Sequence, residues 1–196
     1  MSFEKFEVRV SAINVLPLEN IDTDQIIPAR FLKTTTREGF GDNLFYDWRY
    51  NSDGSKNESF VINSVDNGAK FLVAGRNFGC GSSREHAAWA LYDYGFRAVI
   101  SSFFADIFRN NALNNGLLPV QVSDEFLSKI FSEADSDINA KIEINLKERS
   151  VKILSTGEYE LFPIDDYKQS CLINGYDDID FLCALKNKVE DFENRR

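Results

Sequence analysis

Hydrophobic residues recur along the first part of the chain in two patterns that alternate with each other. Apolar runs of strand length predict strands at residues 7–15, 69–74, 97–101 and 117–122. Apolar residues at helical spacing predict helices at residues 83–94 and 104–114, and Ser123 caps a further helix that runs to about residue 133. Strands that alternate with helices in this way are typical of a layered α/β domain.

The remainder of the chain changes character. Residues 141–146, 150–154 and 158–161 alternate polar with apolar positions or carry β-branched residues, with turn signals between them, and they predict three short antiparallel strands. The acidic end, residues 163–193, has helical periodicity and predicts a helical tail. No repeat, low-complexity tract or linker interrupts the sequence, so we expect a single domain over residues 1–196.

Composition excludes several classes of partner. The chain has 196 residues, 43% of them hydrophobic, and a formal net charge of -9. An acidic protein of this kind repels nucleic acid and anionic membranes, so we expect neither as a partner. No apolar stretch approaches the roughly 20 residues that a membrane-spanning helix needs, and the charged N-terminal residues are unlike a secretion signal. We therefore expect a soluble, cytoplasmic protein.

The most informative segment is residues 75–91, where glycines and serines separate a predicted strand from a predicted helix. Ser82 and Glu85 have the spacing of a capping box, which predicts a helix that begins directly after Ser82. Amides at a helix start favour a carboxylate or phosphate in front of them, and the guanidinium of Arg84 can grip a carboxylate with two donors. The glycine spacing fits neither a dinucleotide fingerprint nor a P-loop. The structural alternative is that Ser82 only caps the helix and that Arg84 only pairs with a nearby acid.

Cysteine usage points to a reducing compartment. Cys80, Cys171 and Cys183 are an odd count without a C-x-x-C pair, which indicates free thiols. An iron–sulfur cluster needs three or four cysteine ligands brought together, and these three are scattered, so no metal site is predicted in this chain. Cys80 lies inside the glycine turn, where a small residue suits the tight backbone, and its role stays open between packing and chemistry.

The segment from residue 31 to residue 59 is long for a connection, and it combines glycines with a cluster of aromatic residues. Long segments of this kind in compact domains are commonly lids or binding loops. The alternative is a packed Ω-loop that covers its own core. If it is a lid, this segment is the best candidate for an apolar wall against a substrate.

Several motifs taken together identify a family. Residues 20–33, with the Asp-Thr-Asp triplet at 22–24, and the Gly-x-Gly-Ser-Ser-Arg-Glu-His-Ala stretch at 79–87 resemble the small subunit of 3-isopropylmalate dehydratase. That family is the swivelling domain of the aconitase superfamily made as a separate chain. The likeness extends through residues 40–49 and 110–119, and little of it lies in the last thirty or so residues. It implies a layered β/β/α swivelling domain, here followed by the helical C-terminal tail.

The resemblance also implies a reaction and a division of labour. The family moves a hydroxyl between adjacent carbons of isopropylmalate through an alkene, and a four-iron, four-sulfur (4Fe-4S) cluster on a separate large subunit helps hydroxide to leave. Ser82 matches the family's catalytic base, acting as an alkoxide. Arg84 matches the residue that holds a substrate carboxylate, with Ser83 and Gly81 in the same substrate-binding turn. Asp24 matches an acidic position that orients groups in the site.

Alternatives remain at this level. In one alternative, Asp22 and Thr23 have no other role than to shape the turn before Ile26. His86, the single histidine, is better explained by packing than by base catalysis. The expected assembly is a heterodimer with the large subunit, acting on a small dicarboxylate. The chain could instead serve a related diacid hydro-lyase, such as a citraconate or maleate hydratase or a homoaconitase-like enzyme, or be a non-catalytic anion-sensing module.

Overall fold

A computed structural model describes residues 3–33, 39–64, 68–186, 190 and 193–194. Seven strands form one curled sheet in the order β4-β3-β2-β1-β5-β6-β7. The first four in chain order are β1 (Val8–Leu16), β2 (Phe71–Ala74), β3 (Ala98–Ser101) and β4 (Leu118–Gln121), and they run parallel to one another. The others, β5 (Lys141–Asn145), β6 (Ser150–Ile153) and β7 (Tyr159–Leu161), are antiparallel.

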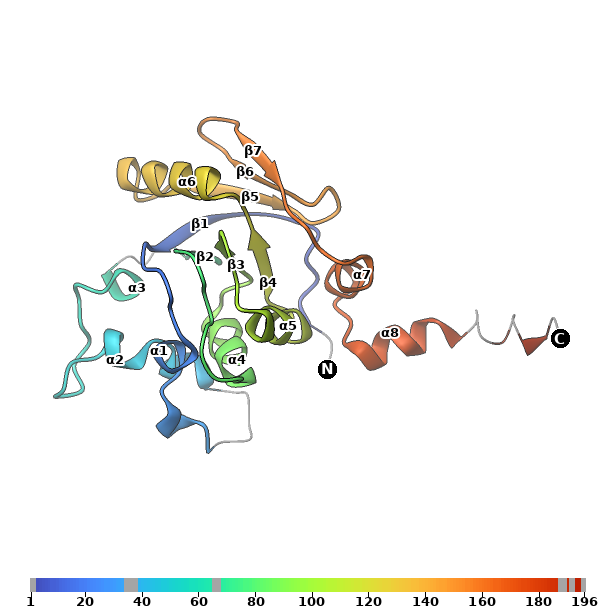
Figure 1. Cartoon of the computed structure of the whole chain (residues 1–196), viewed down its shortest axis with the longest axis horizontal. Coiled ribbons are helices and arrows are strands. Elements are labelled where there is room, and N and C mark those ends of the chain that lie inside the picture. The colour runs from blue at the N-terminus through green and yellow to red at the C-terminus, as the bar shows by residue number, and fades with distance from the viewer. Residues whose placement is uncertain (1–2, 34–38, 65–67, 187–189, 191–192, 195–196) are drawn as a thin grey trace.

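Strand β1 joins the parallel strands to the antiparallel strands. It can do so because it is about twice as long as its parallel neighbours. Its first part, Val8 to Ala12, pairs with β5, and its last part, Ile13 to Leu16, pairs with β2. The sheet bends where the partner changes, so β5 to β7 fold over one face of the parallel strands (Figure 1). The predicted strands are therefore confirmed, including the antiparallel group.

Helices occupy both faces of the parallel strands. Helix α6 (Asp124–Ser136) lies on the same side as β5 to β7, and α4 (Glu85–Tyr94) and α5 (Asp106–Asn114) cover the opposite side (Figure 1). Three one-turn helices precede β2, namely α1 (Thr23–Ile26), α2 (Tyr46–Arg49) and α3 (Val61–Ser64). Two 3-10 turns, η1 (Ala29–Phe31) and η2 (Phe40–Asn43), lie between α1 and α2. This β/β/α layering agrees with the fold class expected from the sequence.

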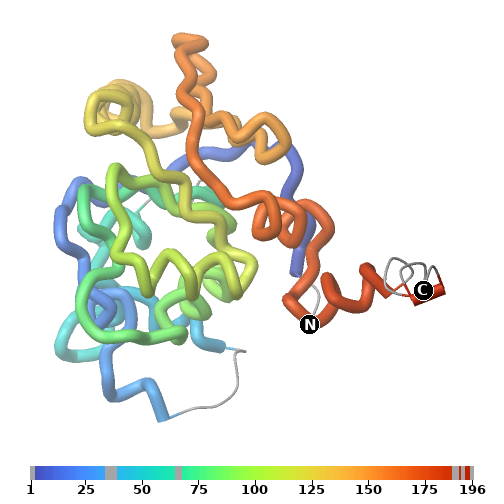
Figure 2. Tube along the Cα trace, turned by 45° about the vertical axis from the view of Figure 1, so that its right-hand side comes forward, coloured from blue at the N-terminus to red at the C-terminus, as the bar shows by residue number. Residues whose placement is uncertain are grey.

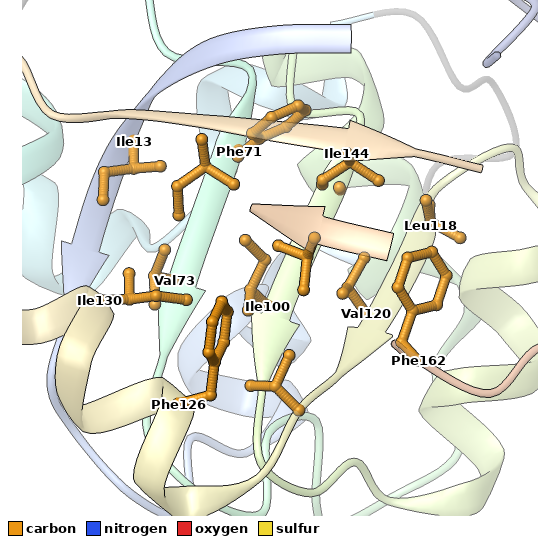
Figure 3. Close-up of a cluster of buried hydrophobic side chains, with 14 of the residues drawn as sticks. Ile13, Phe71, Val73, Ile100, Leu118, Val120, Phe126, Ile130, Ile144 and Phe162 are labelled. Atoms are coloured by element: carbon orange, nitrogen blue, oxygen red, sulfur yellow. The ribbon is translucent and has the colours of Figure 1, made fainter. Parts of the chain in front are cut away.

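The central parallel strands β2 and β3 are buried on both faces, as expected for a sheet covered by helices and strands. On one face, Val73 and Ile100 pack with Phe126 and Ile130 of α6 and with residues of β5 and β6 (Figure 3). On the other face, alternate residues such as Leu72 pack against α4 and α5. The outer strand β4 contains Pro119, which an edge position tolerates because one ladder donor is not needed there.

The acidic end forms α7 (Asp166–Asn174) and α8 (Asp178–Ala184), separated at Gly175, which has a positive φ of 72°. Helix α7 is tied to the N-terminal segment, because the amide of Phe6 donates to the carbonyl of Leu172 over 3.0 Å. Helix α8 extends away from the body of the molecule (Figures 1 and 2). In the described part of the chain, no helix is long and apolar enough to cross a membrane.

Candidate functional site

Two loops that follow neighbouring parallel strands form the site. The segment after β1 and the segment after β2 run side by side and continue the pairing of the sheet beyond its strands. The amide of Gly79 donates to the carbonyl of Ile21 over 2.7 Å, and the amide of Thr23 donates to the carbonyl of Cys80 over 2.9 Å. These bonds bring the motif at residues 20–33 against the glycine turn, as two matching motifs of one site require.

The glycines of the turn are required by different constraints. Gly79 has a φ of +76°, and a Cβ built on it would lie 2.2 Å from the ring of Phe108 in α5. Gly81 has a φ of +89°, but a Cβ there would only touch Asp22 at an ordinary 3.5 Å. Gly79 therefore serves both conformation and close packing, whereas Gly81 serves conformation alone.

The helix after the turn begins later than predicted. Helix α4 starts at Glu85, its N-cap residue is Arg84, and no side chain caps it. The predicted capping box of Ser82 and Glu85 is therefore wrong. The carboxylate of Glu85 instead accepts a hydrogen bond of 3.0 Å from the side chain of Asn115, the C-cap residue of α5. The glycine conformations at 79 and 81 carry the chain through a turn before helical geometry can start.

A capping box is present on the other loop. Asp22 is the N-cap residue of α1, its carboxylate accepts from the amide of Gln25 over 2.7 Å, and its own amide donates to the Gln25 side chain over 2.9 Å. Ile26 and Ile27 follow and are fully buried. This arrangement agrees with the interpretation that Asp22 shapes the turn, and it fixes the place from which Asp24 projects.

Ser82 and Ser83 lie at the surface of the turn. Both residues are exposed, as is Gly81 between Cys80 and Ser82. The carbonyl of Ser82 accepts a hydrogen bond of 2.9 Å from the hydroxyl of Thr23, a residue that is only 2% exposed. The turn thus presents two hydroxyl groups to the outside while its backbone is held from beneath.

Arg84 and Asp24 form the charged part of the site. Nη1 of Arg84 donates to Oδ1 of Asp24. This guanidinium is the larger cause of a lowered pKa of the Asp24 carboxyl, and the backbone amide of Ala29 also lowers it. The Arg84 side chain is 14% exposed and that of Asp24 is 55% exposed, so the arginine is the more enclosed partner. The other two guanidinium nitrogens of Arg84, Nε and Nη2, donate to no acceptor among the described residues.

The neighbourhood of His86 is apolar. Its ring lies 4.5 Å from the ring of Trp89 and 5.4 Å from that of Phe40, measured between centroids. Phe40 comes from η2 and is buried, so the segment at residues 31–59 packs against α4 here. These contacts agree with the packing interpretation of His86 and give the histidine no place in the charged pair.

Residues 40–50 of the 31–59 segment behave as a packed loop, whereas residues 51–56 are exposed. Leu44 and Phe45 are fully buried, and the guanidinium of Arg49, 6% exposed, donates to the carbonyls of Gly41 and Leu44 over 3.1 and 3.2 Å. The Ω-loop interpretation therefore holds for these residues. Residues 34–38 lie outside the described residues, and an apolar wall for substrate stays a prediction.

Cys80 is half-buried beside the site, with its thiol donating to the carbonyl of Asn20 over 3.4 Å. Burial raises the pKa of this thiol, and the nearby Asp22 carboxylate raises it further. Cys171 is buried in α7 and Cys183 is exposed in α8, and all three are free. Among the described residues, no three His, Cys, Asp or Glu side chains gather in a way that could hold a metal ion. The described residues of this chain therefore do not fit an iron–sulfur cluster.

Sequence reasoning missed three contributors to the site. The Thr23 hydroxyl binds Ser82, the Ala29 amide binds Asp24, and the Asn115 side chain binds Glu85 next to Arg84. The Asp-Thr-Asp triplet did mark Thr23 as part of a turn, but its partner is a backbone atom 59 residues later. Asn115 belongs to a run of asparagines whose role a linear pattern does not reveal.

Comparisons with known proteins agree with this arrangement. Residues 4–125 match the aconitase C-terminal domain. A 3-isopropylmalate dehydratase small subunit from Christiangramia forsetii is 58% identical over 193 residues, covering 98% of this chain and 94% of that protein. Another from Cytophaga hutchinsonii is 57% identical over 190 residues, covering 97% and 94%. A crystal structure of 3-isopropylmalate dehydratase from Methanocaldococcus jannaschii matches with a TM-score of 0.67 and 26% identity, over 95% of this chain and 99% of that one.

Proposed function

Because the chain belongs to the family of 3-isopropylmalate dehydratase small subunits, we propose that it supplies the base and the carboxylate-binding arginine for that reaction. The enzyme is a hydro-lyase of leucine biosynthesis, which interconverts 2-isopropylmalate and 3-isopropylmalate through 2-isopropylmaleate. The similarity spans nearly the whole chain, and it does not favour a citraconate, maleate or homoaconitase-like enzyme or a non-catalytic anion sensor.

One observation carries the assignment of roles. An exposed serine turn and an arginine held by an aspartate lie next to each other, and they come from the two loops that bear the family's motifs. A sensor of anions would need the arginine but would not need Ser82. The combination of a surface hydroxyl with a pre-aimed guanidinium is what proton removal next to a carboxylate requires.

In the proposed mechanism, Ser82 as alkoxide takes a proton from the carbon next to the one that loses hydroxide. A serine hydroxyl is a very weak acid, so its anion needs nearby positive charge and donors. Arg84 is the available cation. With Nη1 engaged by Asp24, the edge formed by Nε and Nη2 is free to bind a substrate carboxylate through two parallel hydrogen bonds. Ser83 and the backbone at Gly81 complete the substrate contacts.

Ser82 is a surface residue, and an alkoxide cannot persist in open water. We therefore assign the other half of the site to a large subunit that covers this turn and carries the 4Fe-4S cluster. That cluster supplies Lewis-acid chemistry for the departure of hydroxide. The present chain contributes the base, the clamp and their orientation. We further propose that residues 1–196 act as one domain in a cytoplasmic heterodimer.

The first test is reconstitution. The purified chain is expected to show no isomerisation of 3-isopropylmalate by itself, and activity is expected after it is mixed anaerobically with a cluster-loaded large subunit. Steady turnover by the chain alone would contradict the proposed division of labour.

The second test separates base catalysis from a structural role. Ser82→Ala is expected to lower kcat about 10²-fold to 10⁴-fold, the range for loss of a positioned proton acceptor. Because Ser82 is exposed and is not a helix cap, the free energy of unfolding should change by no more than about 0.5 kcal/mol. Ser132→Ala, on the exposed side of α6, serves as the matched control. Full activity of a folded Ser82→Ala complex would overturn the role of the serine.

A further inference from the structure

The two carbonyl groups on either side of Gly81 are both held by one residue. The amide of Thr23 donates to the carbonyl of Cys80, and the hydroxyl of Thr23 donates to the carbonyl of Ser82, each over 2.9 Å. Gly81 itself has a φ of +89°, a conformation that other residues rarely adopt, and its lack of a side chain leaves the backbone on either side of it less restricted than at any other residue. Without an external hold, the peptide that carries Ser82 could therefore rotate about this glycine.

Thr23 is suited to holding a backbone in a fixed place. It is 2% exposed and forms the first residue of α1, whose start is fixed by the Asp22 and Gln25 capping box. The following residues Ile26 and Ile27 are fully buried. A β-branched side chain has few rotamers, so the direction of the Thr23 hydroxyl is determined by a rigid element rather than by the flexible turn.

No other hydrogen bond to Ser82 occurs among the residues that the structure describes. The Ser82 side chain is at the surface. Ser82 lies two residues before Arg84, the N-cap of α4, so hydrogen bonds within the helix do not restrain it. The link to Thr23 thus holds the backbone from which the Ser82 side chain projects.

From this geometry we infer that Thr23 is a positioning residue for catalysis, acting through Ser82. It does not touch substrate. Its hydroxyl keeps the serine oxygen at the place where it meets the substrate proton, while the Arg84 clamp is held separately by Asp24. The inference rests on the proposed role of Ser82 as base, and it adds a residue whose loss should affect turnover without affecting substrate capture.

The experiment compares Thr23→Val with Thr23→Ser in the complex with the cluster-loaded large subunit. Valine keeps the shape and the amide but removes the hydroxyl, and serine keeps the hydroxyl. Thr23→Val is expected to lower kcat about 10-fold to 100-fold with KM within about twofold of the parent. Thr23→Ser should retain kcat within about threefold. Equal kcat values for the two variants would overturn the inference.

A double variant gives a readout that a merely structural role would not move. If Thr23 acts through Ser82, adding Thr23→Val to Ser82→Ala should cause no further loss of kcat, because the group being positioned is already gone. A further loss equal to that of Thr23→Val alone would show that Thr23 acts by another route. If Ser82→Ala remains active, the proposed base is wrong, which is a different failure from an active Thr23→Val beside an inactive Ser82→Ala.

The comparison needs a control variant and a check that each variant is folded and assembled. Thr156→Val removes a hydroxyl from an exposed turn between β6 and β7, and it should leave kcat unchanged. Circular dichroism and the affinity for the large subunit establish that each variant is folded and assembled. If valine prevents assembly, Thr23→Ala takes its place, since a smaller side chain cannot overfill the buried site, and the same loss of kcat is expected.

Discussion

The guanidinium of Arg84 is held by the carboxylate of Asp24, a residue 60 positions earlier in the chain. The arginine precedes α4, the aspartate lies in α1, and the amide of Ala29 helps to keep the aspartate ionised. One donor of Arg84 is used in this contact. The direction of the arginine side chain is therefore set by a partner within the same chain, as its proposed role of substrate clamp needs.

The carboxylate of Asp24 should matter for catalysis more than for stability. Asp24→Asn keeps the shape but removes the charge that orients Arg84, and we expect kcat/KM to fall about 10-fold to 100-fold, as for a clamp displaced by about 1 Å. Asp166→Asn is the matched control, because Asp166 pairs with Arg149 on the exposed face of the tail. Steady-state kinetics of both complexes check the prediction. Similar small effects of the two substitutions would contradict it.

Arg84→Lys keeps the positive charge and removes the two-pronged donor. We expect kcat/KM to fall about 10-fold to 100-fold, equivalent to the loss of a charge-assisted hydrogen bond of about 1.5–3 kcal/mol. Affinity for the large subunit should be unchanged, and titration of one subunit into the other measures it. A variant that assembles poorly but turns over normally when saturated with partner would make Arg84 an interface residue instead.

The two glycines of the turn should differ in their tolerance of alanine. Gly79→Ala places a methyl group against the Phe108 ring and also strains the backbone, so we expect a loss of about 2–4 kcal/mol in the free energy of unfolding. Gly81→Ala meets only ordinary contacts and should cost about 1–2 kcal/mol. Urea denaturation of each variant measures the difference. Equal losses would show that the ring of Phe108 moves aside without cost.

The contribution of Glu4 to the stability of the fold should depend on pH. Its carboxylate accepts hydrogen bonds from Arg97 and Arg9, both over 2.6 Å, and these lower its pKa from 4.5 to about 2. A lowered carboxyl pKa stabilises the fold fully above the unfolded-state value and loses that contribution as pH falls through the folded-state value. Glu4→Gln should therefore lower Tm at pH 7, and the difference from the parent should shrink between pH 4.5 and about 2.

The outcome for Glu4→Gln is checked by scanning calorimetry at several pH values. Glu4 is partly exposed, so the ion pairs are screened by solvent and the effect on Tm should be modest and smaller at high salt. A difference in Tm that stays constant down to pH 2 would show that the glutamate acts through packing and not through its charge.

The sheet and the larger helices could be predicted from sequence because their signals are local. Strand β2 is an uninterrupted apolar run, and α6 carries both a serine cap and helical periodicity. The one-turn helices α1, α2 and α3 were not predicted. They are too short to show periodicity, and they form because buried residues such as Ile26 and Phe45 anchor them in the core.

The site could be located from sequence but its internal contacts could not. The motifs correctly pointed to Ser82, Arg84 and Asp24 as neighbours, whereas their proposed roles in catalysis remain predictions. The capping box at Ser82 failed because Glu85 finds a partner in Asn115, 30 residues later, and the glycine turn delays the helix. Spacing rules describe contacts along one helix, and these contacts link different elements.

The distance in sequence between the two loops determines when the site can exist. Asn20, Thr23 and Asp24 have hydrogen-bond partners in residues 76–84, so each loop supports the other. During synthesis, the first loop emerges from the ribosome about 60 residues before the second, so the bonds between the two loops cannot form until β2 and the glycine turn have followed. A growing chain stalled before residue 75 would thus already contain the aspartate and the threonine, but it would have no catalytic geometry.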